Sequence, residues 1–259
     1  MALFTDGPVS SIEDLTARDS QLLSTASVEG VDVTQKLGLA QDEIALELGT
    51  LLTRLSYVGQ LFWVPPQPNI GSVVVTPALK LWHTLRALEL VYSDAYNSQL
   101  NDRYAGKRDQ FREMAKWAYE KLVDTGIGIA FCPLPQAAVP QVVTAMGPPP
   151  GIQLPDGTYY VTMAWTNGQG EEGACAVPTT ITTSACTLAV QPGTAPTNAT
   201  GWNLYVGTTP DNLSLENDAP IAAGATWLQP GTLMAGGRAP GSGQSPNYVK
   251  SVPRMIQRG

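Results

Sequence analysis

The sequence is poor in the residues that most enzyme chemistry requires. Its 259 residues include one histidine, His83, and three cysteines, and charged residues make up 14% of the chain. A structural zinc site needs four closely spaced Cys or His ligands, and a Ser–His–acid triad would have to use His83. Gly126 and Gly128 lack the helix that must follow a dinucleotide-binding loop. These shortages argue against catalysis, a metal site and a cofactor.

Positive charge is missing from a long part of the chain. Lys and Arg number 15 against 22 Asp and Glu, and residues 141–232 contain no Lys or Arg at all. That stretch is a poor phosphate-binding surface, because counterion release requires basic side chains at the contact. Residues 233–259 are the reverse, with four basic residues and no acidic one. Rich in Gly, Pro and Ser, this basic tail is predicted to be disordered on its own.

Long apolar runs are also absent. Charge or proline interrupts every apolar stretch within about ten residues, whereas a membrane helix needs ~20. The first residues lack the basic and apolar regions of a secretory signal. We therefore expect neither a membrane span nor secretion. Cys175 and Cys186 would form a disulfide if neighbouring strands brought them together, but reduced thiols are the simpler expectation.

The first half of the chain has helical periodicity. Ser10 and Glu13 have the spacing of a capping box, at the start of a region of short helices that ends at Gly30. Over residues 39–58, apolar residues recur three and four positions apart and define one helical face. The prolines of the following LFWVPPQPNIG segment end that helix.

Two further helices are predicted over 77–97 and 100–124. Thr76 followed by Pro77 is a typical helix start, and Gly126 ends the second helix. Short connections between such helices favour a small antiparallel bundle with these two at its centre. His83, beside Trp82, is interpreted as a surface or packing residue rather than a ligand.

The 100–124 helix carries a set of basic residues that admits two interpretations. They are Arg103, Lys107, Arg108, Arg112 and Lys116. They could form a cationic face close to nucleic acid, or a solvated face with i,i+3 pairs such as Asp109–Arg112 and Glu113–Lys116. The interspersed acidic residues favour the second interpretation.

After the MGPPPG segment the pattern changes to strands. Residues 158–165 are β-branched and aromatic, and Asn167-Gly168 is a strong turn signal. Further candidate strands are 172–177, 180–183, 186–191, 201–207, 213–217 and 225–228. Seven short strands with frequent turns predict an antiparallel sandwich of the immunoglobulin or fibronectin type III kind. The cysteine spacing lacks the immunoglobulin pattern and favours the fibronectin-like form.

The predicted fold class is therefore α+β with several domains. The expected parts are a helical domain at 1–140, a Pro/Gly linker at 141–151, a β-sandwich at 152–232 and an extended basic tail at 233–259.

Particular strings resemble one family. AYNSQLNDRYAGKRDQF, followed by GIGIAFCPLPQAAVP, resembles the head-to-tail adaptor, or connector, proteins of tailed bacteriophages. PVSSIEDLTARDSQLLSTASVEGVDVTQKLGLAQDEIALEL is similar to the opening helices of that family. GTYYVTMAWTNGQGEEG and GWNLYVGTTPDNLSLEN look like fibronectin-type insertions in phage structural proteins. Many adaptors end soon after the helical part, so the β-sandwich would be an added module.

The resemblance implies a structural role in the virion neck, after assembly in the host cytoplasm. The subunit would form a ring, commonly of twelve copies, beneath the portal protein and above a tail or nozzle protein. Double-stranded DNA would pass through the channel during packaging and ejection. An acidic wall suits that passage, since a cationic one would retain DNA.

The resemblance also assigns roles to residues. The basic tail would become ordered on the portal through charged and apolar contacts from Arg238, Tyr248, Val249, Lys250, Val252, Arg254, Met255 and Arg258. The helices 77–97 and 100–124 would lie between subunits or face the lumen, with Phe62 and Trp63 as candidate apolar contacts.

Two other functions remain open from the sequence. The β-sandwich could be a tail or baseplate module that recognises a glycan or a tail protein, if Trp165, Trp202 and Trp227 face solvent. Some phage structural proteins are cell-wall hydrolases, and carboxylate pairs such as Glu171 and Glu172 would then matter.

Overall fold

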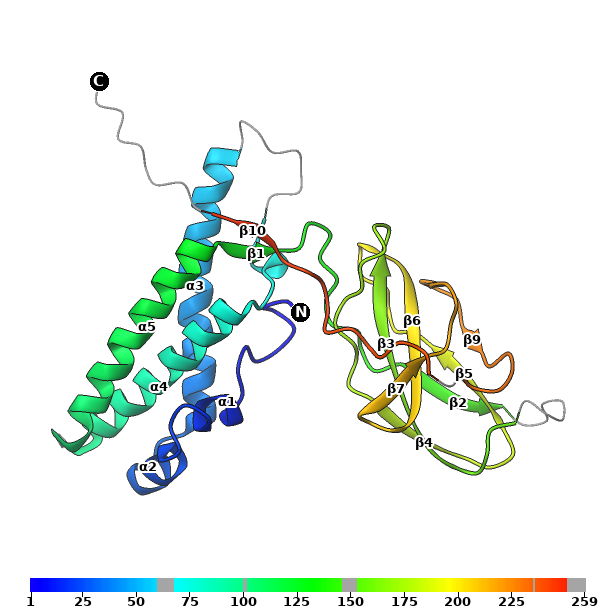
Figure 1. The fold of residues 1–259 in the computed structure, drawn as a ribbon, viewed down its shortest axis with the longest axis horizontal. Helices are drawn as coiled ribbons and strands as arrows, with labels where there is room; N and C mark the ends of the chain where they lie inside the picture. Colours follow the sequence, from blue (N-terminus) through cyan, green and yellow to red (C-terminus); the bar gives the residue numbers. More distant parts are fainter. Residues whose placement is uncertain (60–67, 100–101, 146–152, 235, 251–259) are drawn as a thin grey trace. The chain divides into compact units, whose positions relative to one another are not determined.

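The chain folds into two compact units. The computed structural model describes residues 1–59, 68–99, 102–145, 153–234 and 236–250 (Figure 1). The helical unit contains Gly7–Phe131 and the closing segment from Pro246, and the β unit contains Met1–Asp6 and Cys132–Ser245. The division differs from the expected 1–140 helical domain at both ends, because the first six residues and residues 132–140 belong to the β unit.

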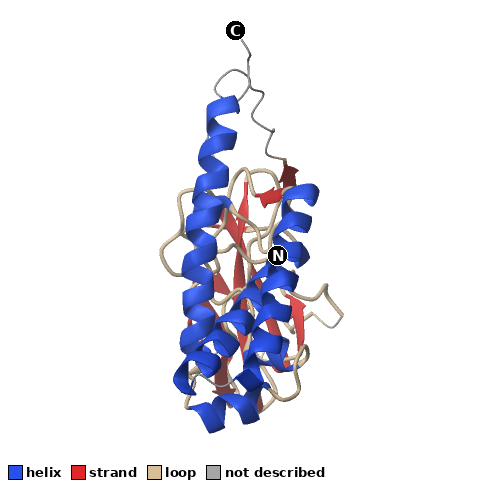
Figure 2. Cartoon of the chain, turned by 90° about the vertical axis from the view of Figure 1, so that its left-hand side faces the viewer, coloured by secondary structure: helices blue, strands red, loops and turns tan. Residues whose placement is uncertain are grey.

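Three long helices dominate the helical unit (Figure 2). They are α3 (Val33–Gly59), α4 (Pro77–Gln99) and α5 (Ala105–Thr125), and the shorter α1 (Ile12–Thr16) and α2 (Leu22–Glu29) precede them. The 3-10 turns η1 (Ile70–Ser72) and η2 (Asp102–Tyr104) come before α4 and α5. α3 and α5 both pack against α4, which buries Leu48, Leu85 and Leu122 among others.

The helix ends follow local side-chain chemistry. Thr76 Oγ1 accepts a hydrogen bond from the Leu79 N–H at 3.3 Å, which confirms the predicted start of α4 at Pro77. Gly126 ends α5 with a φ of 102°, in the region that favours glycine.

The predicted capping box was one residue out of register. The box at α1 is formed by Ser11 and Asp14, not by Ser10 and Glu13. Ser10 turns its hydroxyl to the interior instead, where it meets His83. α3 also begins earlier than expected, because Asp32 Oδ1 accepts the Gln35 N–H at 3.1 Å and caps the helix ahead of Leu39.

A small two-stranded sheet closes the helical unit. β1 (Ile127–Ile129) pairs antiparallel with β10 (Asn247–Val249), with Gly128 opposite Tyr248. A Cβ on Gly128 would lie 2.6 Å from Thr76 Cγ2 and 2.7 Å from Pro246 Cβ, so only glycine fits here. Neither strand was predicted, and β10 comes from the expected free tail.

The β unit contains two antiparallel sheets. One has the order β4-β3-β6-β7, with β8 also paired to β6, and the other has the order β2-β5-β9. The strands are β2 (Gln141–Ala145), β3 (Gly157–Asn167), β4 (Thr179–Thr183), β5 (Thr187–Gln191), β6 (Ala199–Thr209), β7 (Asn212–Leu215), β8 (Ile221–Ala222) and β9 (Trp227–Leu228). The chain is thus α+β, with helices followed by antiparallel sheets, as predicted.

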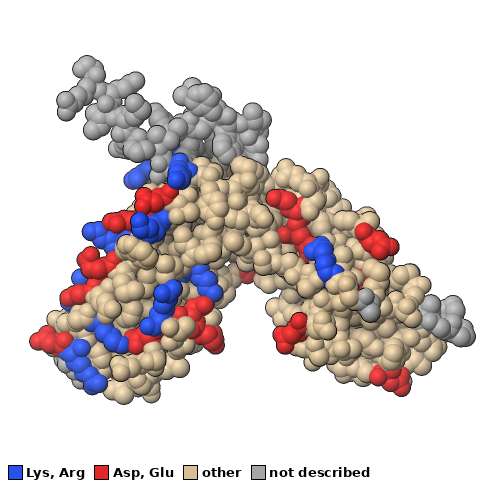
Figure 3. All heavy atoms as spheres, in the orientation of Figure 1, with Lys and Arg blue, Asp and Glu red and all other residues tan. Residues whose placement is uncertain are grey.

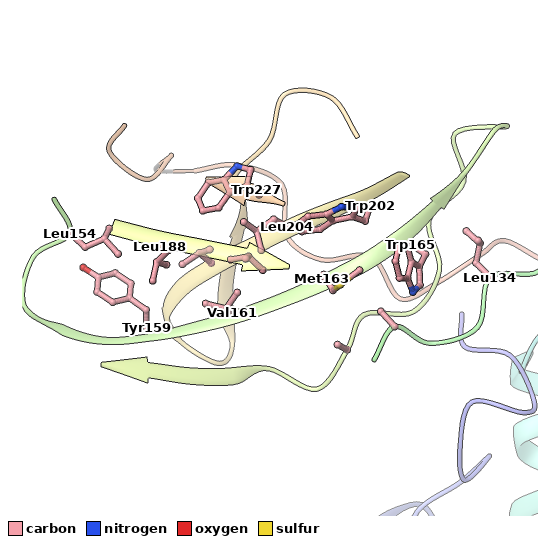
Figure 4. Close-up of a cluster of buried hydrophobic side chains, with 14 residues drawn as sticks. Leu134, Leu154, Tyr159, Val161, Met163, Trp165, Leu188, Trp202, Leu204 and Trp227 are labelled. Atoms are coloured by element: carbon pink, nitrogen blue, oxygen red, sulfur yellow. The ribbon is translucent and has the colours of Figure 1, made fainter. Parts of the chain in front are cut away.

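One buried cluster draws on both sheets (Figure 4). Alternate residues of β3 and β6 enter it, among them Trp165 and Trp202, which are register partners. β5 contributes Leu188 and Val190, and β9 contributes Trp227. The alternation that predicted β3 therefore reflects its burial in this cluster.

Two segments of the β unit differ from prediction. Residues 141–145 of the expected linker form β2, which pairs along its whole length with β5. The predicted strand 172–177 is an irregular segment that hydrogen-bonds beside β3, with an isolated bridge between Thr166 and Glu172. The predicted Asn167-Gly168 turn is confirmed, since Asn167 Oδ1 accepts the N–H groups of Gln169 and Glu171, each at 3.0 Å.

Candidate interaction surfaces

The helical unit has a groove between its three long helices. Its volume is about 670 Å³, and α3, α4 and α5 all line it. The lining residues are Glu43, Ile44, Leu46, Glu47, Trp82, Arg86, Glu89, Arg112, Ala115, Lys116 and Tyr119. Ile44, Trp82 and Ala115 are buried, so they form the floor. The Trp82 and Tyr119 rings lie with centroids 5.0 Å apart, which fixes the aromatic end of the groove.

A chain of ion pairs crosses the groove. Arg86 lies 2.7 Å from Glu43 and 2.5 Å from Glu89, and Glu89 also pairs with Arg112 at 3.2 Å. Burial lowers the pKa of Arg86, but its hydrogen bonds with Glu43 and Glu89 outweigh this and hold the pKa above its ordinary value. These four residues therefore neutralise one another across the three helices.

The two walls of the groove also carry charged side chains that take no part in these ion pairs. Leu46 on α3 is 75% exposed. Glu47 follows it, and Lys116 lies on the α5 wall. Within the described residues neither Glu47 nor Lys116 has an ion-pair partner. The groove thus has an acidic wall with an exposed leucine and a basic wall opposite.

Lys107 is a structural residue rather than a surface charge. Its Nζ lies 2.7 and 2.8 Å from the two carboxylate oxygens of Asp19 and 3.2 Å from the Tyr92 hydroxyl. Tyr92 also donates to Asp19. Burial raises the pKa of Asp19, but the bonds from Lys107 and Tyr92 outweigh it and hold the pKa below its usual value. The cluster fastens the α1–α2 connection to α4 and α5.

Arg103 in η2 and other basic residues of α5 are also engaged within the unit. Arg103 lies 5.5 Å from the Tyr104 ring centre, and Arg108 lies 4.3 Å from that of Tyr96. The predicted Asp109–Arg112 pair is confirmed, at 3.6 Å. The predicted Glu113–Lys116 pair is not among the ion pairs of the described residues. Of the five predicted basic residues, Lys116 is therefore the one that the structure leaves for another partner.

His83 is a buried packing residue, as the sequence suggested. Its Nδ1 lies 2.5 Å from Ser10 Oγ and its Nε2 lies 3.1 Å from the Leu37 carbonyl oxygen. A neutral ring satisfies both contacts, with Nε2–H donating to Leu37 and Nδ1 accepting from Ser10. Burial lowers the pKa of His83 and favours that neutral form.

The tail that was expected to be free contacts the rest of the chain in the part that the structure describes, which ends at Lys250. In the β unit, Arg238 pairs with Glu172 and lies 5.6 Å from the centre of the Tyr205 ring. Gln244 is 2% exposed, and its side chain accepts from the Leu134 N–H at 2.7 Å and donates to the Cys132 carbonyl at 3.0 Å and to Glu171 at 2.8 Å. The expectation of disorder is therefore wrong for this segment, which is held by these contacts and buries the side chain of Gln244.

The remaining tail residues lie in or beyond β10. Tyr248 is exposed, Val249 is half-buried, and Lys250 is exposed. The predicted contacts Val252, Arg254, Met255 and Arg258 lie outside the described residues, as do Phe62 and Trp63. Their assignment to a partner surface stays a prediction.

Two titratable groups of the β unit have strongly raised pKa values, buried Glu216, which was not singled out from the sequence, and partly buried Cys175. Burial raises the pKa of Glu216 to about 7, although its carboxylate accepts the Met234 N–H at 2.8 Å. Burial, with the nearby Glu172 charge, raises the pKa of the Cys175 thiol to about 12. Cys175 is thus a protonated thiol at neutral pH, unsuited to nucleophilic chemistry.

The residues that would support glycan recognition or cell-wall hydrolysis are buried or bind other side chains of the β unit. Trp165, Trp202 and Trp227 are all buried, so they offer no stacking platform for a sugar. Glu171 and Glu172 bind Gln244 and Arg238 rather than facing a cleft. Cys132, Cys175 and Cys186 are free thiols. In the described parts of the chain, no three His, Cys, Asp or Glu side chains gather as metal ligands, and no helix is long and apolar enough to span a membrane.

No model of a known protein family matches the sequence, and no curated protein matches it. The function is therefore argued from the surfaces above.

Sequence reasoning missed two of the exposed apolar residues of the long helices, Leu46 and Trp117. Leu46 lies outside the apolar stripe formed by Ile44, Leu48 and Leu51, and Trp117 lies among the charged positions of α5. A large apolar residue at a position where the helical period predicts a polar one was the available signal.

Proposed function

We propose that the chain is a structural subunit of a phage head-to-tail connector, which forms a ring, of about twelve copies in the family that it resembles, in the virion neck. The groove of the helical unit carries this proposal. Its floor is apolar and the charges that cross it neutralise one another in ion pairs, while exposed Leu46, Glu47 and Lys116 remain on its walls. Such a surface suits contact with protein, since apolar and unpaired charged groups lie side by side with no reactive group among them. The resemblance of the helical strings to connector proteins gives that contact a setting.

The proposed neighbours are further copies of the chain, a portal protein and a tail or nozzle protein, with double-stranded DNA passing through the channel. The charge distribution supports transient rather than tight DNA contact. Figure 3 shows basic and acidic side chains interspersed over the helical unit, and few charges on the visible face of the β unit. Mixed signs weaken the field that would hold the DNA backbone.

The β unit is proposed to be an added module of the fibronectin type III kind. Two antiparallel sheets that share one buried cluster support a sandwich of this class. In the connector it would decorate the ring or meet the tail.

The proposed portal contact is confined to the end of the chain. Arg238 is already paired with Glu172, so removing residues 238–259 would damage the β unit itself. The contact is instead assigned to exposed Tyr248 and Lys250 and to residues 251–259.

The test is co-sedimentation with the portal encoded in the same genome. The full chain is expected to bind the portal, and a chain ending at Lys250 is expected to keep its fold and lose most of that binding. Undiminished binding by the truncated chain at moderate salt would remove residues 251–259 from the portal contact. Absence of binding by the full chain would contradict the connector function.

A further inference from the structure

We infer that neighbouring copies of the chain meet head to tail, with the Trp117 side of α5 on one copy seated in the α3–α4–α5 groove of the next. The inference rests on the proposed ring and names the contact that would build it. One exposed surface supplies the projecting residue, and the groove supplies the recess.

The projecting surface is centred on Trp117, which is 50% exposed. Glu113 and Glu120 lie one helical turn before and after it, and both are exposed. Within the described residues neither glutamate has an ion-pair partner. A half-exposed tryptophan between two unpaired carboxylates resembles the anchor of a protein interface, because a large ring gains most from burial and the charges set its orientation.

The groove offers the complementary groups. Lys116, without an ion pair of its own, and Arg112 line its α5 wall and suit the carboxylates of Glu113 and Glu120. Exposed Leu46 and buried Trp82 supply apolar surface for the incoming ring. The charges of Lys116, Glu113 and Glu120 and the exposed side chains of Leu46 and Trp117 would then meet in a single contact.

Trp117 and the groove lie on different sides of one helix, with Glu113 and Glu120 between them, and this decides the symmetry. Successive residues of an α-helix diverge by about 100°, so Trp117 points well away from Lys116 beside it. The buried positions Ala115, Ala118 and Leu122 fix the side of α5 that faces α4. One subunit therefore cannot fill its own groove with its own Trp117. A contact between two different patches is heterologous, and such contacts close into rings when the rotation allows.

The test uses two complementary variants of the full chain. Leu46→Asp spoils the groove and leaves Trp117 intact, whereas Trp117→Asp spoils the projecting surface and leaves the groove intact. Both residues are exposed, so far-UV circular dichroism should show an unchanged fold. Val28→Asp on α2, also exposed, is the matched control and should assemble like the wild type.

Sedimentation velocity should show wild-type oligomers and two monomeric variants, each with self-association weakened by at least about thirtyfold. Mixing the two variants should give one-to-one dimers and nothing larger, because one intact groove meets one intact Trp117. Lys116→Glu and Glu113→Lys should each weaken assembly, and their combination in one chain should restore it.

The outcomes separate this contact from the ring. If the wild type forms oligomers and both variants do so equally well, the inferred contact is wrong and the connector proposal stands. If each variant is monomeric but the mixture gives no dimer, the two surfaces do not meet each other and the inference also fails. A wild type that stays monomeric with and without the portal contradicts both proposals.

Discussion

The two units satisfy their buried polar groups in different ways. The helical unit uses ions, such as Lys107 with Asp19 and the chain of pairs through Arg86 and Glu89. The β unit has carboxylates that accept hydrogen bonds, such as Glu216, but it also relies on neutral amides. Asn217 accepts the Leu204 N–H at 2.8 Å and donates to Asn203 at 2.9 Å. Of the ion pairs among the described residues, Arg238–Glu172 alone belongs to the β unit.

This difference explains the charge distribution along the sequence. A sheet leaves backbone groups unpaired where strands end or bulge, and a short amide side chain that both donates and accepts can satisfy them without a charge. Helices satisfy their own backbone, so polar side chains are free to join one helix to another through ion pairs. Residues 141–232 thus need no Lys or Arg, and the one basic residue that the β unit uses, Arg238, comes from the basic tail at 233–259.

The largest expected effect comes from removing the basic tail from Arg238 onward. Truncation before Arg238 leaves the Glu172 carboxylate without its cation and the Leu134 N–H without the Gln244 side chain. We expect the β unit to lose about 3 kcal/mol or more of unfolding free energy, measured by hydrogen exchange of β3 and β6. Truncation after Lys250 is the control and should change little. Equal protection of the β unit in both chains would mean that the segment is not part of its core.

The next largest effect distinguishes the roles of Lys107 and Lys116 on α5 in the stability of the helical unit. Lys107→Met leaves the buried Asp19 carboxylate without its cation and should destabilise the helical unit by about 2 kcal/mol, less than for a fully buried pair because Lys107 is partly exposed. Lys116→Met should leave the stability unchanged, since Lys116 has no such partner in the described structure. Urea denaturation followed at 222 nm measures both. Equal losses would contradict the assignment of Lys107 to structure and Lys116 to assembly.

A smaller effect concerns Glu216 in the β unit. Its folded pKa, about 7, lies above the ordinary value of 4.5, so the folded state binds the additional proton between these values. Stability should therefore fall as the pH rises from about 4.5 to 7. Glu216→Gln, which can still accept the Met234 N–H, should stabilise the β unit by about 1 kcal/mol at pH 8 and have little effect at pH 4. Hydrogen exchange at the two pH values checks this, and destabilisation at pH 8 would show that the charge is needed.

The smallest expected effect concerns His83 in the helical unit. Its contribution to stability depends on pH in the opposite direction to that of Glu216. Burial lowers the pKa of His83, so the unfolded chain takes up a proton before the folded one. Stability is full above the unfolded pKa of about 6.5 and declines as the pH falls below it. The midpoint of urea denaturation, followed by circular dichroism at 222 nm, should decrease from pH 7.5 to 5.5 in the wild type. It should vary less in His83→Gln. The same slope in both would assign the pH dependence to other groups.

The sequence predicted the helical unit better than the β unit. Helical period, Thr76-Pro77 and Gly126 located the long helices because these signals are local. β1, β2 and β10 were missed because each is short and is defined by a partner far along the chain, such as β5 for β2. The tail was predicted to be disordered from its composition alone, which does not reveal that Gln244 finds buried partners more than a hundred residues away.

The candidate surfaces were predicted only in part. The basic residues of α5 were found from the sequence, but their roles were not, because Asp19 is 88 residues from Lys107 and no spacing rule connects them. The interpretation of α5 as a solvated face of mixed charge rested on the i,i+3 pairs Asp109–Arg112 and Glu113–Lys116. Of these, the structure has Asp109–Arg112. The groove needed three helices to be placed together before Leu46 and Lys116 could be recognised as its opposite walls.

The most direct test of the connector function is electron microscopy of the purified chain mixed with its portal. The account predicts rings of the chain stacked coaxially on the portal, with neighbouring subunits in contact through their helical units. Particles that remain single subunits and leave the portal bare would contradict it.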